Sequence, residues 1–437
     1  MRETGASRRT LSRELPRYCP RFPEPLTKGW GSAGSPLPCE KVAGVSDRLR
    51  VLIVATHPIQ YQVPWFRALA NVATIDLSVL YIQRPDAAQQ GVGFDIPFEW
   101  DIPLLEGYGW TQAPDVRGRG GLTGFFASRL AHPSRLLRDL TPDALLLTGW
   151  HAWPLLQLLL AARRQGLPVL MRGDSNALRR RPLPVRLLHR LLFTNCAAFL
   201  TVGKSNRDLY RDAGVPEKRL FSAPHFVDNA RFGESAAQLS PRRDELRQSW
   251  RIPKNAVCFC FVGKLQRVKR IFDLLEAMKL VQARTEQSIH LLIVGTGELM
   301  RQAREMAERQ GLPITFTGFV NQTEIPAAYV ATDCLVLPSD HETWGLVLNE
   351  AMACGLPAIV SDRVGCAADL ITEGETGALF PFGDVQALAR CLIAMAADPA
   401  RMRAMGVRAR NRVEREYSVA KAVDGTLAAL RFTCGST

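Results

Sequence analysis

The chain has 437 residues, which is too long for one hydrophobic core and predicts two domains of ordinary size. Its hydrophobic content of 47% and charged content of 22% are typical of globular proteins and exclude a wholly disordered chain. The net charge of +13 indicates an anionic partner: a phosphate-bearing substrate, an acidic lipid surface or a nucleic acid. No aromatic-basic strand pair or zinc finger accompanies this charge, so we expect no nucleic-acid partner.

The ten cysteines are scattered along the chain. They form no Cys-x-x-Cys pair and no Cys/His cluster with zinc spacing. Most fall in apolar segments, where a reduced thiol behaves as a small hydrophobic residue. This usage predicts a reducing, cytoplasmic compartment.

Residues 1–46 are rich in Arg, Pro, Gly and Ser and show no apolar period. They lack the continuous apolar stretch that a signal peptide needs. We expect a disordered basic extension, with a wrongly chosen start codon as the alternative.

From Leu49 onward, short apolar runs alternate with helix-like segments such as 63–72. Each run is β-branched or leucine-rich and ends at Gly, Pro or a polar turn, which is typical of strands buried on both faces of a parallel sheet. The strands expected in the first half are 51–56, 75–82, 144–149, 168–173 and 197–203.

The stretch 143–162 is long enough to span a bilayer. Gly149, His151 and Pro154 interrupt it. We therefore expect a buried strand that leads through a loop into a buried helix.

Residues 224–254 are polar, charged and weakly periodic, and then the alternation restarts. The strands expected in the second half are 256–263, 289–295, 314–319, 334–339 and 358–362. Strand spacings of roughly 20–35 residues fit right-handed βα units in a doubly wound sheet. The sequence predicts an α/β protein with two Rossmann-like domains facing a cleft. The expected divisions are 1–46 (extension), 47–228 (first domain), 229–255 (linker), 256–415 (second domain) and 416–437 (terminal segment).

Two glutamates, Glu342 and Glu350, follow the strand expected at 334–339, where open α/β sheets bind ligands. A helix that starts near Gly345 would separate their Cα atoms by about 12 Å along its axis. Its N-terminus suits a phosphate, and Gly345 lets the backbone approach a ligand closely. A ligand with hydroxyls at one end, a diphosphate in the middle and a ribose at the other end would fit. Two helix-surface charges are the alternative.

A second loop, FVGKLQRVKR at 261–270, follows the first strand of the second half. Gly263 ends that strand, and Lys264 and Lys269 stand at the start of the next helix. Two cations beside a helix N-terminus would neutralise a diphosphate leaving group without a metal. A solvated basic helix start is the alternative.

With these loops in view, residues 256–430 resemble the donor-binding domain of retaining GT-B glycosyltransferases of family GT4, and residues 49–230 resemble that family loosely. The family signature of Glu, seven residues and Glu is met by Glu342 and Glu350. Its Gly-Arg-Leu-x-x-x-Lys phosphate loop corresponds to Gly263 through Lys269. Lys264 stands where arginine is usual, so bidentate phosphate pairing is lost while the charge stays.

The resemblance implies a metal-independent transfer of a sugar, with retention of configuration, from a nucleotide-diphospho-sugar to a hydroxyl acceptor. That acceptor would be lipid-linked or a cell-surface glycan. The resemblance implies no cofactor besides the donor substrate, and a last helix near 418–430 that crosses back onto the first domain.

The residue roles that the resemblance implies all concern the donor. Lys264 and Lys269 would bind the diphosphate and Glu350 the ribose. Glu342 would hold the sugar, and the catalytic set would be Glu342, Lys264 and Lys269. The full donor-side set is Gly263, Lys264, Lys269, Gly295, Phe319, Glu342, Trp344, Gly345, Leu346 and Glu350. Gly295 and Phe319 would lie near the base, and we expect Trp344 to change the shape of the sugar pocket.

The acceptor-side candidates lie in three loops of the first domain. They are His57 and Gln60 after the first strand, His151 in TGWHAW, and Arg172 and Asp174 in MRGDSN. Loop capping is the alternative for His57 and Gln60, and core packing is the alternative for His151.

The region 129–190 is dense in arginine, including Arg179, Arg180 and Arg181 beside the apolar sequence LLHRLLF. Basic residues beside a leucine-rich face suit docking on the anionic inner face of the plasma membrane. An ordinary solvated helix face is the alternative, so peripheral membrane contact of a cytoplasmic protein stays open.

Two other functions stay open. A nucleotide-sugar 2-epimerase would use the same fold without an acceptor, and the second-domain motifs argue against it. A non-enzymatic nucleotide-sugar-binding protein would bind without turnover, and the intact Glu342, Glu350 and Lys269 argue against it.

Overall fold

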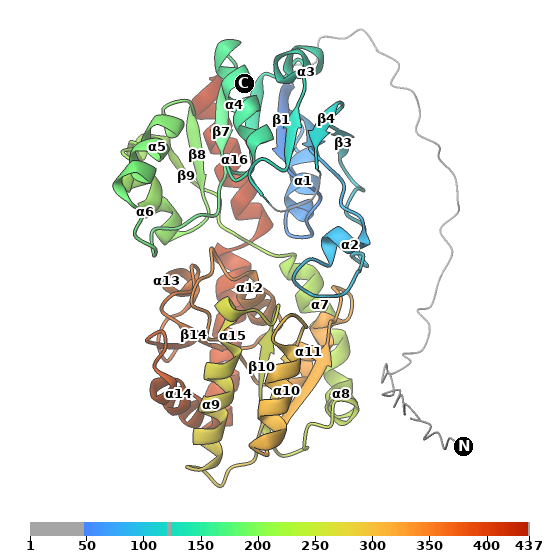
Figure 1. Ribbon diagram of the computed structural model, residues 1–437, viewed down its shortest axis with the longest axis vertical. Coiled ribbons are helices and arrows are strands. Elements are labelled where there is room, and N and C mark those ends of the chain that lie inside the picture. Colours follow the sequence, from blue (N-terminus) through green and yellow to red (C-terminus); the bar gives the residue numbers. More distant parts are fainter. Residues whose placement is uncertain (1–47, 120–123, 436–437) are drawn as a thin grey trace, which may run out of the picture. The chain divides into compact units, whose positions relative to one another are not determined.

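The computed structural model of the protein describes residues 48–119 and 124–435 (Figure 1). The extension predicted over residues 1–46 lies outside the described residues. The eight cysteines within the described ranges are all free thiols, and five of them are buried. Their placement agrees with the expectation that they act as small core residues.

The first domain is built on a seven-stranded sheet of order β3-β2-β1-β6-β7-β8-β9, in which every neighbouring pair is parallel. The strands are β1 (Leu49–Ala55), β2 (Ile75–Tyr81), β3 (Gly109–Gln112), β6 (Ala144–Leu147), β7 (Val169–Met171), β8 (Ala198–Thr201) and β9 (Leu220–Ser222). The five strands expected from the sequence are all present. The edge strands β3 and β9 were not predicted, because β3 is exposed throughout and β9 has only three residues.

The connections of the first domain are mainly helical. They contain α1 (Val63–Ala70), α2 (Ala87–Gln90), α3 (Pro133–Leu140), α4 (Trp153–Arg164), α5 (Leu183–Phe193), α6 (Lys204–Asp212), the 3-10 turn η1 (Glu217–Arg219) and a hairpin of β4 (Val116–Gly118) and β5 (Ser128–Leu130). The apolar stretch 143–162 forms β6 and most of α4, as predicted. Among the described residues, no helix is both long enough and apolar enough to cross a bilayer.

The second domain has a six-stranded parallel sheet of order β12-β11-β10-β13-β14-β15. Its strands are β10 (Val257–Val262), β11 (Ile289–Val294), β12 (Ile314–Gly318), β13 (Cys334–Leu337), β14 (Ala358–Ser361) and β15 (Gly377–Phe380). The order reverses between β10 and β13, which is where doubly wound sheets bind ligands. The connections contain η3 (Arg267–Lys269), α9 (Ile271–Gln282), α10 (Met300–Arg309), α11 (Ile325–Ala331), α12 (Leu346–Ala353), α13 (Ala367–Leu370) and α14 (Val385–Ala397).

Both sheets are buried on their two faces, which explains the continuous apolar runs in the sequence. Val51 and Ile53 of β1 belong to one cluster of buried residues. Leu52 and Val54, which alternate with them, belong to a different cluster. The residues of β10 divide between two further clusters in the same way.

The segment expected to be a linker is mostly helical. It forms α7 (Asn229–Leu239), the 3-10 turn η2 (Ser240–Arg242) and α8 (Arg243–Ser249). Two of its arginines, Arg243 and Arg247, both bind Asp333. This partner lies far away in the sequence, so the local pattern of the segment does not reveal the helices.

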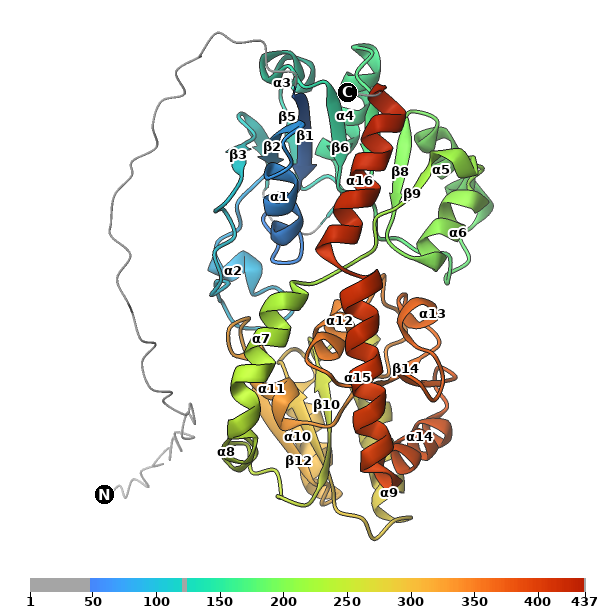
Figure 2. The ribbon, with the colours of Figure 1, turned by 180° about the vertical axis from the view of Figure 1, so that it is seen from behind.

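The last two helices are α15 (Pro399–Glu416) and α16 (Val419–Cys434). Helix α16 lies beside β8, β9 and α1 of the first domain (Figure 2). In the buried contact, the indole Nε1 of Trp65 donates to Thr426 Oγ1 at 3.2 Å. The chain therefore returns to the first domain at its end.

A buried histidine in β11 makes the fold acid-sensitive. His290 is 6% exposed, and its Nε2 lies 3.0 Å from Thr315 Oγ1. Burial, with a smaller effect from the charge of Arg247, lowers the pKa of His290 to about 4. The unfolded chain takes up this proton near pH 6.5 and the folded chain does not. Folding stability is therefore lost as the pH falls from about 6.5 toward 4, by up to about 1.4 kcal/mol per pH unit.

Urea unfolding at pH 7 and pH 5 checks this expectation. The variant His290→Leu should lose about 2 kcal/mol less stability between the two pH values than the wild type. The control variant His132→Gln changes an exposed histidine and should keep the wild-type difference. Equal pH dependence in the wild type and His290→Leu would contradict the role of His290.

Candidate active site

The loops after β10, β11 and β12 meet at the edge of the second sheet. The backbone N–H of Gly263 donates to Val294 O at 3.0 Å, and that of Gly295 donates to Gly318 O at 2.8 Å. Gly295 has φ +125°, and a Cβ there would lie 2.0 Å from the carbonyl oxygen of Gly263. Only glycine fits this approach, so the two donor-side glycines predicted from the sequence are packed together.

The predicted sugar and phosphate residues are in direct contact. Lys269 Nζ forms an ion pair with Glu342 Oε1, and Ser339 Oγ donates to the same oxygen at 2.8 Å. The side chains of Lys269 and Glu342 are only 18% and 14% exposed. Removal of either partner would leave the other charge largely buried and unpaired, which would lower the free energy of unfolding.

Helix α12 begins as the sequence predicts. Gly345 is its N-cap with φ +109°, and Leu346 is its first residue. No side chain caps this helix start. Its first N–H groups are therefore available to an anionic ligand.

The side chain of Trp344 is buried. Its ring is 3% exposed, and Nε1 donates to Asn349 Oδ1 at 2.8 Å. A Cβ at Gly203 of the first domain would lie 2.2 Å from the ring, and His225 packs against the ring at 5.4 Å between centroids. The ring is therefore fixed in a core shared by both domains, and the expectation that Trp344 changes the shape of the sugar pocket stays a prediction.

Glu350 is almost fully buried, at 1% exposed. Its Oε2 accepts a hydrogen bond from the hydroxyl of Tyr329 at 2.7 Å. Its Oε1 accepts no well-formed hydrogen bond, although Tyr61 and Gln322 lie beside the carboxylate. Burial raises the pKa of Glu350, while Tyr329 and the charge of Arg231 oppose that shift. A ribose would reach this buried carboxylate only if side chains around it moved.

A cavity of about 260 Å³ lies beside Tyr61 and is lined by both domains. Gln60, an acceptor-side candidate, lines it and has a buried Oε1 without a hydrogen bond among the described residues. Arg231 lines it too and donates to the carbonyl and side-chain oxygens of Gln322, both at 2.7 Å. Sequence reasoning missed Tyr61, Arg231 and Gln322, because their proximity depends on how the two domains pack.

Residues 92–98 of the first domain lie over the phosphate loop. Lys264 Nζ donates to Val92 O at 2.8 Å and lies 4.7 Å from the centroid of the Phe94 ring. Burial and the charge of Lys269 lower the pKa of Lys264. The rings of Phe94 and Phe98 approach Phe319 at centroid distances of 5.1 and 4.3 Å. The first domain therefore lines the place expected for the nucleotide base, a contribution that the sequence did not indicate.

Residues 99–101, which follow this segment, also bind the second domain. The carboxylate of Asp101 accepts from the backbone N–H of Thr323 at 3.1 Å, and Asn321 Nδ2 donates to Glu99 O at 2.7 Å. In Asp101→Ala we expect amide exchange at Thr323 to rise about fivefold, because this solvent-exposed bond contributes about 1 kcal/mol. Hydrogen–deuterium exchange of residues 319–325 measures this change.

The control for this prediction is Glu99→Gln, which keeps the carbonyl that Asn321 binds. Its exchange at Thr323 should match that of the wild type. Unchanged exchange in Asp101→Ala would show that the two segments are not held together in solution.

Three acceptor-side candidates lie close together at the first-domain loops. His57 Nδ1 lies 3.0 Å from Thr56 Oγ1, and burial together with the charge of His151 lowers the pKa of His57 to about 4. His57 is therefore neutral near pH 7. Burial lowers the pKa of His151, while the nearby charge of Asp174 opposes that shift, and Asp174 Oδ2 accepts from Thr343 Oγ1 at 3.2 Å.

The loop after β7 is joined to the Glu342 loop by Asn176. Its Nδ2 donates to Glu342 O at 2.9 Å and to Thr343 O at 3.0 Å. Sequence reasoning did not select Asn176, although it ends the polar run MRGDSN that supplied Asp174. These contacts, with that of Asp174 to Thr343, place the loop after β7 beside Glu342.

The side chain of Arg172 is buried. It is 6% exposed, and its guanidinium lies 4.9 Å from the ring centroid of Trp65 and 5.6 Å from that of Phe226. Its Nη2 lies 3.4 Å from Pro224 O, a long hydrogen bond, and burial lowers its pKa to about 10. The side chain of Arg172 thus packs inside the first domain, and its role toward an acceptor stays a prediction.

Residues 48–119 and 124–435 contain no group of three His, Cys, Asp or Glu side chains placed to hold a metal ion. The expected metal independence of the reaction stays a prediction.

A family model of known proteins matches most of the second domain. The profile of the family described as Glycosyl transferases group 1 matches residues 242–412. N-acetyl-alpha-D-glucosaminyl L-malate synthase of Bacillus anthracis is 30% identical over 210 residues, which cover 48% of this chain and 52% of that protein. The GDP-mannose-dependent alpha-(1-6)-phosphatidylinositol monomannoside mannosyltransferase of Mycolicibacterium smegmatis is 29% identical over 219 residues, or 48% of this chain and 56% of that protein. The chain thus spans about half the length of these relatives.

A solved glycosyltransferase of Rickettsia africae shares the fold of both domains. It has a TM-score of 0.69 and 14% sequence identity, and it covers 90% of this chain and 100% of its own. The matched residues 242–412 include every donor-side position described above, from Gly263 to Glu350. Residues 242–412 therefore resemble the Glycosyl transferases group 1 family, and the chain has the GT-B fold.

Proposed function

We propose that the protein is a glycosyltransferase that moves a sugar from a nucleotide-diphospho-sugar to a hydroxyl acceptor, with retention of configuration and without a metal. The observation that carries this proposal is the Lys269–Glu342 pair beside the uncapped start of α12. A group 1 relative whose name is GDP-mannose-dependent supports a nucleotide-sugar as the donor class.

In this proposal the donor diphosphate lies at the start of α12, between Lys264 and Lys269. Lys269 would exchange Glu342 for the phosphate and stabilise the charge that develops as the sugar–phosphate bond breaks. Glu342, released from Lys269, would accept hydrogen bonds from the sugar hydroxyls. Lys264 would have to leave the carbonyl of Val92, so donor binding would rearrange residues 92–98.

The acceptor would approach from the first-domain loops that carry His57, His151 and Asp174. Its hydroxyl oxygen forms the new bond to the anomeric carbon while the bond to the donor phosphate breaks on the same face. The departing phosphate oxygen takes the acceptor proton, so no enzymic nucleophile is required. Catalysis then rests on orientation of the two substrates and on charge stabilisation. A lipid-linked or cell-surface glycan remains the acceptor class that we propose.

Calorimetric titration of the full chain with UDP-, GDP- and ADP-sugars in EDTA tests the donor site. We expect one donor class to bind, and Lys269→Met to weaken that binding at least tenfold through loss of a charge-assisted contact. The control Lys279→Met, an exposed position on α9, should bind like the wild type. The assigned site would be contradicted if the wild type bound none of the donors. It would also be contradicted if Lys269→Met and Lys279→Met bound the donor equally well.

A further inference from the structure

Helix α5 presents its leucines to solvent. Of its eleven residues only Phe193 is buried. Leu183, Leu187 and Leu191, spaced four residues apart on one stripe, are 64%, 53% and 67% exposed. The neighbouring Leu188 is 63% exposed. An apolar stripe that faces outward on a helix with a single buried residue needs an explanation other than core packing.

This stripe is also where exposed apolar side chains concentrate. Fourteen large apolar residues are exposed within the described ranges, and six of them lie between residues 178 and 191. Single exposed apolar residues are ordinary on protein surfaces, whereas a cluster marks an interaction surface. Figure 1 shows α5 at the margin of the first domain, beside β8 and β9.

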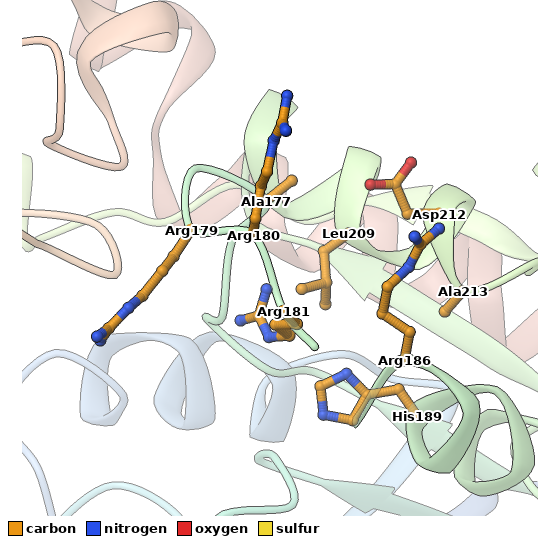
Figure 3. Close-up of a pocket in the computed structure, with 9 residues that line it drawn as sticks. All are labelled: Ala177, Arg179, Arg180, Arg181, Arg186, His189, Leu209, Asp212 and Ala213. Carbon is orange, nitrogen blue, oxygen red and sulfur yellow. The ribbon is translucent and has the colours of Figure 1, made fainter. Parts of the chain in front are cut away.

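A basic pocket borders the leucine stripe. Arg179, Arg180, Arg181, Arg186 and His189 line a cavity of about 320 Å³ together with Asp212 (Figure 3). Residues 175–207 contain no Asp or Glu, so Asp212 is the one acidic residue that lines this basic pocket in the part of the chain that the structure describes. None of the four pocket arginines forms an ion pair within the part of the chain that the structure describes.

The pocket has a built inner wall and a free outer rim. Arg181 Nη1 donates to Asn176 O at 2.7 Å, and the His189 ring packs on Trp150 and Phe193 at centroid distances of 5.6 and 5.5 Å. Arg179 and Arg180 extend in different directions from the loop that leads to α5 (Figure 3). The fixed groups shape a cationic recess, and Arg179 and Arg180 form the rest of its basic lining.

We propose that α5 and the preceding loop 178–182 dock the protein onto a bilayer surface that carries anionic phospholipids. The leucine stripe would enter the boundary between headgroups and acyl chains. The arginines would pair with lipid phosphates, one of which the pocket accommodates. The combination of unpaired positive charge and exposed leucines favours this occupant, because an anionic bilayer complements both.

The docking does not depend on the proposed reaction, but it fits that reaction. Asn176, which binds Arg181 through its carbonyl, also contacts the Glu342 loop. The basic pocket and the candidate active site therefore share one loop. If the proposed transfer holds, this position would bring the site to the surface where a lipid-linked hydroxyl acceptor resides.

Flotation of the full chain with lipid vesicles tests the proposal. Binding should require phosphatidylglycerol in phosphatidylcholine vesicles and should fall at least tenfold in Leu187→Ser/Leu188→Ser/Leu191→Ser. Arg180→Gln/Arg186→Gln should lose about fivefold per arginine. The matched controls are Val407→Ser, which is 61% exposed on α15, and Arg403→Gln/Arg415→Gln on the same helix, and both should bind like the wild type.

Several results would overturn the docking. Equal binding to neutral and anionic vesicles, no binding, or equal losses in the α15 controls would each do so. A dimer of the wild type that the triple leucine variant lacks would assign the stripe to self-association instead. Binding of soluble glycerol phosphate without vesicle binding would assign the pocket to a small phosphate ligand.

Donor titration separates this proposal from the proposed function. The triple leucine variant should bind the nucleotide-sugar like the wild type, which also shows that it is folded. Lys269→Met should float with anionic vesicles like the wild type. Loss of vesicle binding in Lys269→Met would contradict docking through α5.

Discussion

Replacement of Lys269 by methionine is expected to lower kcat by about 100- to 1000-fold, because one fixed donor of positive charge to the departing diphosphate is lost. Methionine keeps a long, flexible side chain at this position. Glu342 would remain only 14% exposed and would lose its ion-pair partner. We therefore also expect the free energy of unfolding to fall by about 1–3 kcal/mol.

The double variant Lys269→Met/Glu342→Gln distinguishes catalysis from stability. It removes the unpaired charge, so thermal unfolding should recover most of the loss. Its kcat should stay at or below that of Lys269→Met, as measured by steady-state kinetics with the donor class identified by calorimetry. Recovery of both stability and kcat would show that Lys269 acts only through the fold.

The second large effect is expected for Glu350→Gln, in donor binding. Two hydrogen bonds from ribose hydroxyls to a carboxylate would be weakened, which predicts a 10- to 100-fold higher Kd for the donor, about 1.4–2.7 kcal/mol. Burial raises the pKa of Glu350, so its ionised form costs stability as the pH rises through that pKa. The neutral glutamine avoids this cost, and Glu350→Gln should unfold at a higher temperature than the wild type at pH 7.

Weaker donor binding together with higher stability is a combination that a purely structural Glu350 would not give. Calorimetry and differential scanning calorimetry on the same samples measure the two quantities. The control Glu308→Gln changes an exposed carboxylate on α10 and should alter neither. If Glu350→Gln bound the donor normally, the ribose role would be wrong.

The central strands were predictable because the sheet faces are covered on both sides. Alternate residues of β1 and β10 belong to different buried clusters, one on each face of the sheet. Every residue in such a strand is therefore apolar, which gives an unbroken apolar run in the sequence. The edge strand β3 has no such signature, and β15 carries a glycine and an exposed leucine. Helix α8 was missed because contacts of Arg243 and Arg247 with Asp333 hold it, and α7 was missed because it buries only Phe232, Gly233 and Ala236, which give no clear apolar period.

The places of Glu342, Gly345 and Glu350 in the candidate site were predictable from the motif of Glu, seven residues and Glu. They also follow from the tendency of open α/β sheets to bind ligands in the loops after their strands. Their contacts do not, because Lys269 lies 73 residues before Glu342 and Val92 lies 172 residues before Lys264. The packing of Arg172 and Trp344 was also beyond local reasoning. A residue just after a strand can face the cleft or the core, and only the surrounding structure decides.

The most direct test of sugar transfer is nuclear magnetic resonance of the full chain with its donor and simple hydroxyl acceptors in EDTA. The account predicts release of the nucleoside diphosphate together with a new glycosidic product that has the anomeric configuration of the donor. Both signals should be reduced about 100-fold or more in Lys269→Met. A product of inverted configuration, or a donor epimerised at C2 without any acceptor, would contradict the account.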